Sequence, residues 1–353
     1  MLKKILLLFL LCSSLGFAQD DSTRFIRDRS IIALPVVFKL PETGFGGGAA
    51  GTASWRFGDS KSSQASIGLT FTQKKQVLAF LPFQVFFNEN KYFINADIGW
   101  FKYNYLYYGI GENRVEPEKY DVKYPRIKLL ASKRISKNSY AGIRFNYEEY
   151  NITDVLPGGV LSQRKVPGYD YSRTFGFGPA IVFDTRDSVF YPHKGVFGEV
   201  NQMASFEGFI ADRTFYQTTA DISVYKELTP KLVLANNGYG ILSFGRALPF
   251  SQMAMLGGAK KMRGLYQGFF RDNNALLFQS ELRYVIWRFA GVTGFGAMGI
   301  LGDTEQLLRF KSPKFSYGAG LRIATKNHLN LRIDYALSPY AKGNLYATIG
   351  EAF

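Results

Sequence analysis

The stretch 328–339, HLNLRIDYALSP, alternates between large apolar side chains and small or polar ones. Successive side chains of an extended strand point to opposite faces, so this alternation gives one apolar and one polar face. The apolar face carries Leu329, Leu331, Ile333, Tyr335 and Leu337. The opposite face carries Asn330, Arg332, Asp334, Ala336 and Ser338. The stretch therefore predicts a β-strand between an apolar and a polar environment.

The same alternation recurs along most of the chain and predicts sixteen strands in all. They are 30–40, 45–57, 62–73, 76–88, 91–103, 124–137, 139–150, 172–184, 194–207, 212–227, 230–244, 274–287, 290–302, 313–324, 328–339 and 343–353. A soluble sandwich also alternates, but this chain contains 32 Phe and 22 Tyr residues. Alternating segments of about ten residues flanked by aromatic girdles are typical of transmembrane β-barrels.

A membrane environment decides how such strands must be arranged. After residue 19 no apolar run approaches the roughly 18 residues that a membrane helix needs. Strands in hydrocarbon have to close on themselves, because every backbone group must be paired within the protein. The predicted fold class is therefore all-β, a sixteen-stranded antiparallel transmembrane β-barrel over 30–353, and the predicted location is the bacterial outer membrane.

The connections between the predicted strands support this count. If both chain ends face the periplasm, connections from odd to even strands face outward and the others are short turns. The three long connections, 104–123, 151–171 and 245–273, all fall on the outward side. The longest predicted periplasmic turn is 185–193.

The first 19 residues predict a secretory signal peptide. They contain Lys3 and Lys4, an apolar run from Ile5 to Leu11 and small residues around Ala18. Cys12 raises the alternative of a lipoprotein signal, but Leu11 stands where a small residue should precede it. Cleavage leaves 41 basic and 28 acidic residues, a net charge of +13, and no cysteine. Residues 20–29 are then a short periplasmic segment before the barrel.

The segment 256–284, LGGAKKMRGLYQGFFRDNNALLFQSELRY, combines a glycine-rich loop with an alternating strand. Gly257 and Gly258 are the expected hinges of the loop, since paired glycines mark tight turns or close backbone approach. Arg263 could pair with a buried carboxylate through its five-donor fork. The alternative is a basic surface loop in which the cations are simply solvated.

This segment resembles the outer-loop motif of the bacterial assembly and translocation barrels typified by BamA and TamA. In that motif a hydrophobic residue, Arg and Gly are followed by an aromatic residue and then by a strand with an inward Glu. Similarity extends to 184–195, to 295–304 and to the terminal Phe353. The resemblance covers essentially the whole mature chain. It implies that the sixth outer loop folds back into the lumen.

The resemblance also implies which residues hold this loop. Arg263 and Gly264 form the loop motif, and Glu281 and Asp303 are the expected acidic partners of Arg263 on the inner wall. Alternation independently places Glu281 inward, although an ion pair with Arg283 is an alternative role. Ala297 stands where the family carries a second acid, so the clamp is expected to be weaker or to use another partner. Leu265 replaces the family's aromatic residue, with Tyr266 as a candidate substitute.

The seam between the first and last strands is the second feature to which the resemblance points. Pro35 and Pro41 are expected to interrupt or bound the first strand, because proline donates no ladder hydrogen bond. Gly343 and Gly350 are expected to weaken the closing strand, which ends at Phe353. A poorly paired seam could open sideways. The alternative is that Pro35 lies below the membrane and the seam is intact.

Other classes of function receive less support from the sequence. His193 and His328 both fall at predicted periplasmic turns, so an outward-facing catalytic site is not expected. Asp184, Asp187 and His193 form a nonspecific set, and no metal or other cofactor is expected. The compartment argues against nucleic acid as a partner. Lipopolysaccharide or ions at the outer surface explain the positive charge better.

Two functional hypotheses remain at this stage. In the first, the barrel inserts or translocates proteins or other components at the outer membrane, with lipids including lipopolysaccharide and other outer-membrane or periplasmic proteins as partners. Residues 20–29 are too few for the periplasmic POTRA domains of the assembly barrels, so clients would be met by the barrel or by a separate protein. In the second, the chain is a passive pore or a structural protein with the same fold.

Overall fold

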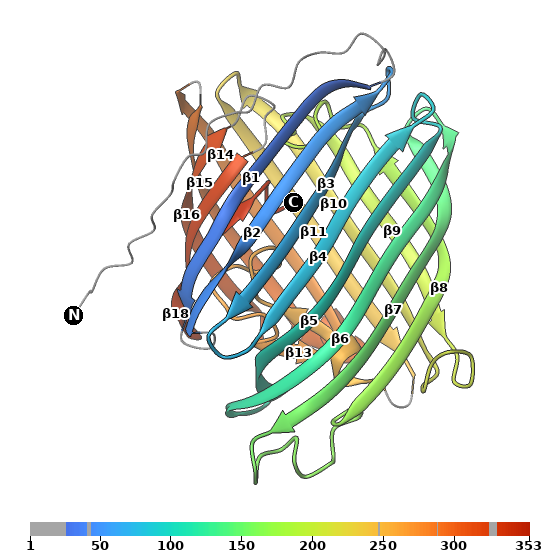
Figure 1. Cartoon of the computed structure of the whole chain (residues 1–353), viewed down its shortest axis with the longest axis vertical. Coiled ribbons are helices and arrows are strands. Elements are labelled where there is room, and N and C mark those ends of the chain that lie inside the picture. The colour runs from blue at the N-terminus through green and yellow to red at the C-terminus, as the bar shows by residue number, and fades with distance from the viewer. Residues whose placement is uncertain (1–25, 41–43, 246–247, 288, 325–329) are drawn as a thin grey trace, which may run out of the picture.

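The computed structural model describes residues 26–40, 44–245, 248–287, 289–324 and 330–353. They form one sixteen-stranded sheet, in which β1 to β11 are followed by β14 to β18, and a small sheet of β12 and β13. The strands of the large sheet are tilted and surround a lumen (Figure 1). The predicted all-β fold with sixteen antiparallel strands is confirmed, with two short helical segments in its connections.

The large sheet contains the following strands: β1 (Ile26–Leu40), β2 (Gly44–Phe57), β3 (Ser62–Thr72), β4 (Val77–Phe87), β5 (Tyr92–Ile110), β6 (Asn113–Ser136), β7 (Ser139–Val155), β8 (Tyr171–Asp184), β9 (Gly195–Ser205), β10 (Phe215–Thr229), β11 (Leu232–Phe244), β14 (Asn274–Trp287), β15 (Ala290–Gly302), β16 (Lys314–Ala324), β17 (Asn330–Ser338) and β18 (Ala341–Ile349). The connections hold η1 (Phe250–Gln252), β12 (Ala254–Leu256), β13 (Phe270–Asp272) and α1 (Thr304–Leu308).

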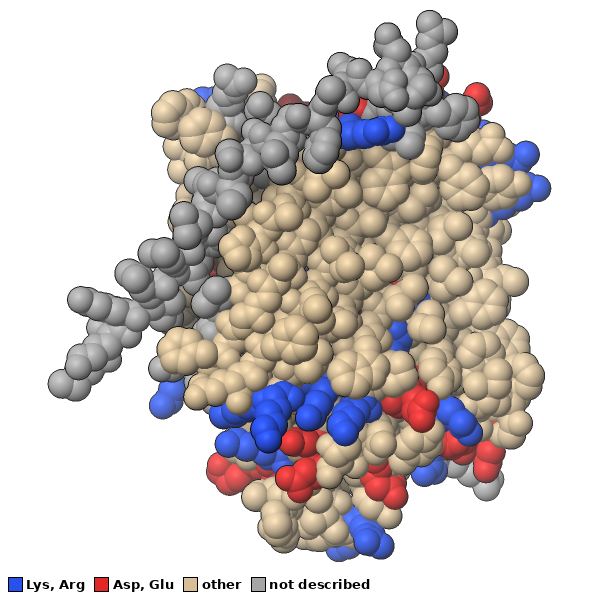
Figure 2. Space-filling view, in the orientation of Figure 1, with Lys and Arg blue, Asp and Glu red and all other residues tan. Residues whose placement is uncertain are grey.

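Alternation along the strands separates an apolar outer surface from a polar lumen. In β17, Tyr335 is 52% exposed on the outside, whereas the lumen-facing Asp334 and Ala336 are fully buried. Uncharged residues cover the middle of the face that carries β2 to β7, and charged residues gather at its two ends (Figure 2). This is the distribution that a bilayer requires of a barrel wall. Among the described residues, no helix has the length and the apolar composition needed to cross a membrane.

The strands β5 and β6 extend well beyond the predicted limits. They have 19 and 24 residues and remain paired as far as Ile110 and Asn113, so the predicted connection 104–123 is wrong. Polar side chains there suggested a loop, but the inner face of the hairpin carries apolar and tyrosine side chains that pack in a buried cluster with Phe250. The hairpin therefore continues as sheet past the membrane and folds over the outer mouth of the barrel.

The two ends of the chain depart from the predicted seam. β1 begins at Ile26 and continues through Pro35, which lies opposite Ala49 in β2, so Pro35 does not interrupt the strand. Pro41 lies outside the described residues. β18 ends at Ile349, and Gly350 has a φ of +85°. The expectation that the closing strand runs to Phe353 is wrong, because the chain turns at Gly350 toward the charged groups of the lumen.

Candidate functional site

The connection between β11 and β14 is the sixth outer loop, and it folds back into the lumen as the family resemblance implied. Its turn is closed by hydrogen bonds from Gly257 N to Lys261 O (2.8 Å) and from Gly258 N to Leu265 O (2.9 Å). Gly257 has a φ of +118°, and a Cβ there would lie 1.9 Å from the carbonyl oxygen of Tyr266. The hinge therefore needs glycine for its backbone angle and for its close packing.

Gly264 brings the tip of the loop against the barrel wall. Its φ is +105°, and a Cβ would lie 2.8 Å from the carbonyl oxygen of Leu337 in β17. On either side of it Met262 and Leu265 are fully buried in an apolar cluster with Leu277 of β14. Leu265, which stands where the resembling family prefers an aromatic residue, thus fills an apolar site. The loop is a packed part of the lumen rather than a solvated surface loop.

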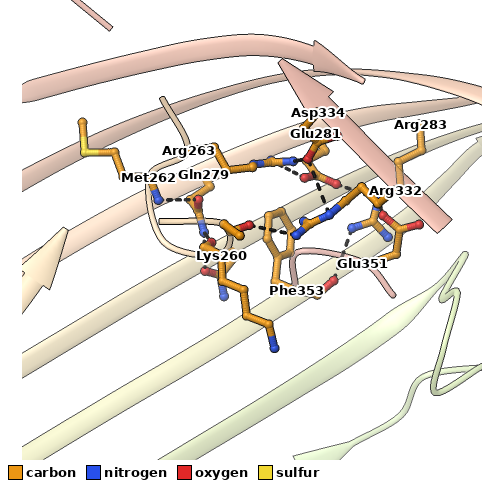
Figure 3. A network of polar contacts seen from close by, with 12 residues as sticks. Lys260, Met262, Arg263, Gln279, Glu281, Arg283, Arg332, Asp334, Glu351 and Phe353 are labelled. Carbon is orange, nitrogen blue, oxygen red and sulfur yellow. Dashed lines mark hydrogen bonds and ion pairs between the residues drawn. The ribbon is translucent and has the colours of Figure 1, made fainter. Parts of the chain in front are cut away.

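Arg263 is the centre of the site. Its Nη1 donates to Asp334 Oδ2 at 2.5 Å and its Nη2 donates to Glu281 Oε1 (Figure 3). Its guanidinium lies 3.5 Å from the ring centroid of Phe295. The Arg263 side chain is 2% exposed, and both carboxylates are fully buried. A planar guanidinium can satisfy two carboxylates and stack on a ring at the same time. The predicted contact between Arg263 and Glu281 is therefore present.

The expectation for Asp303 is wrong. Asp303 is the N-cap of α1 at the outer rim, where its side chain accepts from Gln306 N at 2.8 Å. It follows the end of β15, whereas Arg263 lies deeper in the lumen beside β14 and β17. The second acid is Asp334 of β17. Ala297 of β15, which replaces the family acid, packs against the apolar cluster of the loop.

Two glycines of β16 leave the space in which this acid and Phe295 lie. A Cβ at Gly320 would lie 2.0 Å from Asp334 Oδ1, and a Cβ at Gly318 would lie 2.6 Å from the ring of Phe295. Any larger side chain at these positions would displace a partner of Arg263. The shape of the wall therefore contributes to the site as much as its charges do.

The ion pairs around Arg263 continue into a larger network. Glu281 Oε2 accepts from Arg283 Nε at 2.8 Å, and Asp334 Oδ1 accepts from Arg322 Nη1 at 2.6 Å. Arg332 Nε lies 3.5 Å from Asp334. Glu281 therefore binds both Arg263 and Arg283, so the two roles weighed for it from the sequence coexist. Charged side chains buried in this way are stable only when each has partners.

The end of the chain joins the same network. Arg322 Nε donates to Glu351 Oε2 at 2.9 Å, and Arg283 Nη2 donates to the backbone oxygen of Phe353 at 3.2 Å (Figure 3). The Glu351 side chain is 3% exposed. Gly350 and Phe353 were predicted as seam residues. In the structure, the segment from Gly350 to Phe353 instead lies inside the barrel and contacts the loop network.

Strand β18 also holds the backbone of the loop directly. Gly264 N donates to the hydroxyl of Tyr346 at 3.0 Å, and that hydroxyl donates to Leu265 O at 2.9 Å. Asn344 Nδ2 donates to Gly264 O at 3.1 Å. Sequence reasoning missed both side chains, although their alternate positions, 344 and 346, place them on the lumen face. The loop is thus attached to the last strand of the barrel.

The loop and the long hairpin meet at the outer mouth. The ring of Phe250 lies between Tyr107, Tyr120 and Tyr150, with ring centroids 5.7 to 5.9 Å away. Arg271 Nη1 donates to Phe250 O at 2.9 Å, and Gly111 N at the tip of the β5–β6 hairpin donates to Arg271 O at 2.8 Å. The loop and the long hairpin together cover the lumen from outside.

The β8–β9 connection carries the remaining residues singled out from the sequence. Asp184 binds Arg186 (3.0 Å) and Lys61 (3.0 Å), as a network at a turn. His193 Nδ1 lies 3.5 Å from Asp187, at the end of the barrel opposite the long hairpin. His328 lies outside the described residues. The part of the chain that the structure describes contains no group of three or more His, Cys, Asp or Glu side chains placed to hold a metal ion.

A sixteen-stranded barrel with an outer loop fastened in its lumen by a buried Arg defines a class of outer-membrane assembly and translocation barrels. Residues 45–353 match the Omp85 superfamily domain, and the chain belongs to this superfamily. The protein is an integral β-barrel of the bacterial outer membrane. This membership supports a role in the insertion or translocation of proteins there, and it does not favour a passive pore.

Solved structures show the same fold. The chain is similar to BamA from Haemophilus ducreyi lacking POTRA domains 1–3, with 14% identity and a TM-score of 0.58 over 91% of this chain and 69% of that one. It is also similar to CdiB from Escherichia coli, with 14% identity and a TM-score of 0.55 over 92% of this chain and 61% of that one. CdiB from Acinetobacter baumannii matches at 10% identity, with a TM-score of 0.54 over 92% of this chain and 59% of that one. No curated protein sequence matches the chain.

Proposed function

We propose that this barrel inserts or translocates other proteins at the outer membrane, and that the sixth outer loop sets the position of its last strand. The observation that carries the proposal is the double attachment of the loop. Arg263 is bound by acids of β14 and β17, and the backbone of Gly264 and Leu265 is bound by side chains of β18. Displacement of the loop would therefore act on the strand that ends the wall.

The last strand is suited to such a movement. β18 has nine residues, against 15 in β1, and its pairing with β17 shifts register between Ala336 and Ser338. Gly343 in β18 has a φ of +80°. A short, irregular strand loses fewer backbone hydrogen bonds when it separates than a long regular one, and in hydrocarbon each lost bond is costly. The predicted seam opening thus stays part of the proposal, with β18 as the strand that moves.

Proteins of this family work in the outer membrane with other proteins. We include periplasmic proteins and membrane lipids, lipopolysaccharide among them, in the proposed set of partners. The chain spans 59% to 69% of the lengths of the three similar structures, so its clients remain part of the proposal. We also propose that the barrel is not an enzyme, since His193 and Asp187 lie at a turn at the end of the barrel opposite the long hairpin, where an outward-facing catalytic site could not use them.

The proposal is tested with cells that carry Arg263→Ala, cells that lack the protein, and a matched control, Arg144→Ala. Arg144 is also a lumen arginine, bound to Glu199 at 3.1 Å, but it lies outside the loop network. Folding of each variant is checked by heat-modifiable gel mobility, and outer-membrane protein profiles are compared. We expect folded Arg263→Ala to reproduce the deletion profile and Arg144→Ala to match wild type. A folded Arg263→Ala barrel with a wild-type profile would contradict the proposal.

Single-channel conductance separates the two hypotheses further. Because the loop and the β5–β6 hairpin cover the outer mouth, the wild-type barrel is expected to conduct poorly. A large, salt-dependent conductance that is unaffected by Arg263→Ala would support the passive pore instead.

A further inference from the structure

The outer face of β5 and β6 carries a row of lysines at the outer edge of the apolar surface. Lys102 of β5 lies directly opposite Lys123 of β6, and Lys119, four residues before Lys123 and nearer the hairpin tip, lies opposite Leu106. Basic residues border the uncharged surface at the end where this hairpin extends, and most acidic residues lie beyond them (Figure 2). We call Lys102, Lys119 and Lys123 the lysine row.

The depth of the lysine row is set by its apolar neighbours. Trp100 lies two residues before Lys102 on the same face of β5 and is 41% exposed to the outside. Ile127, also 41% exposed, shares the face of Lys123 on β6. At about 3.3 Å per residue, the Lys102 Cα lies roughly 7 Å beyond that of Trp100. Exposed tryptophans of barrels lie at the membrane interface, so the lysine row lies at the level of the outer-leaflet headgroups.

The lysine row is not held in salt bridges within the described residues. None of the three lysines forms an ion pair with another described residue. Asp121 lies between Lys119 and Lys123 on the same face of β6 and accepts a hydrogen bond from Asn104, and Glu149 accepts from Tyr171 at 3.0 Å, so the closest carboxylates are hydrogen-bonded to neutral groups rather than ion-paired with the lysine row. Like charges directly opposite each other destabilise a strand pair. An external anion between Lys102 and Lys123 would remove this repulsion.

We propose that the lysine row binds the phosphate groups of a phosphorylated glycolipid of the outer leaflet. Lysine ammonium groups bind phosphate as point charges, and the adjoining apolar surface around Trp100 would contact the acyl chains of the same molecule. The lysine row lies on the outside of the wall, whereas the loop network lies inside it. The inference rests on the lipid partners named in the proposed function and gives them a binding site, but loss of binding at the lysine row and loss of the loop network are measured separately, so either can fail without the other.

The test measures binding of lipid A by the purified, folded barrel in detergent, using native mass spectrometry. Wild type is compared with the double variant Lys102→Gln/Lys123→Gln and with Lys119→Gln. The matched control is Lys133→Gln, an exposed lysine on the same face of β6 at the other end of the apolar surface, opposite Tyr92. Dephosphorylated lipid A and inorganic phosphate serve as alternative ligands.

Basic residues near a charged membrane surface each contribute about a fivefold gain in affinity. We expect Lys119→Gln to weaken lipid A binding about fivefold, the double variant about 25-fold, and Lys133→Gln less than twofold. Wild type is expected to bind dephosphorylated lipid A no better than the double variant binds lipid A. The proposal would be overturned if wild type bound the two lipids equally or if the double variant bound lipid A as well as wild type does. It would also be overturned if Lys133→Gln lost as much affinity as the double variant, or if inorganic phosphate displaced lipid A at the concentration of the lipid.

Discussion

The two sides of the lumen wall hold their charges in different ways. On the β5–β9 side, charges form isolated pairs that water reaches: Arg126 binds Asp97 at 2.8 Å with side chains 22% and 39% exposed, and Arg144 binds Glu199 with both 15% exposed. On the β14–β18 side, four arginines and three acids share partners and are at most 4% exposed. These are Arg263, Arg283, Arg322, Arg332, Glu281, Asp334 and Glu351.

The two kinds of charge contact differ in how strongly they fix the positions of their side chains. A pair that water reaches contributes little to stability and is screened by salt. A fully buried charge is different, because removal of one partner leaves the other unpaired in a medium of low dielectric constant. On the β14–β18 side, loss of a single charge should therefore lower the free energy of unfolding more than on the β5–β9 side.

The largest effect is expected for Asp334→Asn. The change keeps the shape of the side chain but removes the charge that Arg263 and Arg322 share, so the free energy of unfolding should fall by about 3–5 kcal/mol. The matched change on the other side, Glu199→Gln, should cost at most about 1 kcal/mol. Urea unfolding in micelles, followed by the fluorescence of the three tryptophans, measures both values. Similar losses in the two variants would remove the distinction between the two sides.

A smaller effect is expected for Gly264→Ala, which tests the approach of the loop to β17. The added Cβ combines an unfavourable φ of +105° with a contact of 2.8 Å to Leu337 O, so the cost should be about 2–3 kcal/mol. Gly208 has a φ of +82° but nothing within 4 Å of its Cβ position. Gly208→Ala should therefore show the backbone cost alone, about 1 kcal/mol. Equal costs would mean that the loop does not press against β17.

Tyr346→Phe tests whether the last strand, β18, holds the backbone of the loop. Loss of the hydroxyl leaves Gly264 N and Leu265 O without this partner, and the expected cost is about 1–2 kcal/mol in the same unfolding assay. Tyr317 of β16 points outward and is 56% exposed, so Tyr317→Phe is the control and should change stability by less than about 0.5 kcal/mol. A Tyr346→Phe barrel as stable as this control would show that β18 does not hold the loop.

The smallest effect is expected for Arg144→Ala. Because water reaches its pair with Glu199, the loss should stay below about 1 kcal/mol at low salt. It should shrink further in about 1 M salt, where the screening length is near 3 Å. Unfolding at both salt concentrations measures the change. A loss of several kcal/mol, independent of salt, would place Arg144 with the buried network instead.

Much of the barrel could be predicted from local alternation. The period of two in 328–339 and its repeats predicted the strand count and the inward direction of Glu281, since these depend only on neighbours along the chain. The same pattern also placed Asp334 on the lumen face. It could not show that Asp334 reaches Arg263, because that depends on the stagger between β14 and β17 and on the space left at Gly320.

The wrong predictions also concern features that depend on contacts between distant parts of the chain. Asp303 was matched to a family pattern, but its position just past the end of β15 makes it the cap of α1 rather than a wall residue. The inward turn at Gly350 depends on partners for Glu351 on β14 and β16, which no local pattern reveals. The long β5–β6 hairpin was missed because its polar residues resemble a loop, while its stability comes from packing around Phe250.

A double-mutant cycle between the loop and the wall measures most directly whether the ion pair of Arg263 holds the loop. The coupling energy between the two side chains follows from the free energies of unfolding of wild type, Arg263→Ala, Asp334→Ala and the combined variant. The same cycle for Arg144 and Glu199 provides the reference. We expect a coupling of about 2–3 kcal/mol for Arg263 with Asp334 and less than about 0.5 kcal/mol for the reference pair. A coupling between Arg263 and Asp334 no larger than that of the reference pair would contradict the claim that this ion pair fastens the loop to the barrel wall.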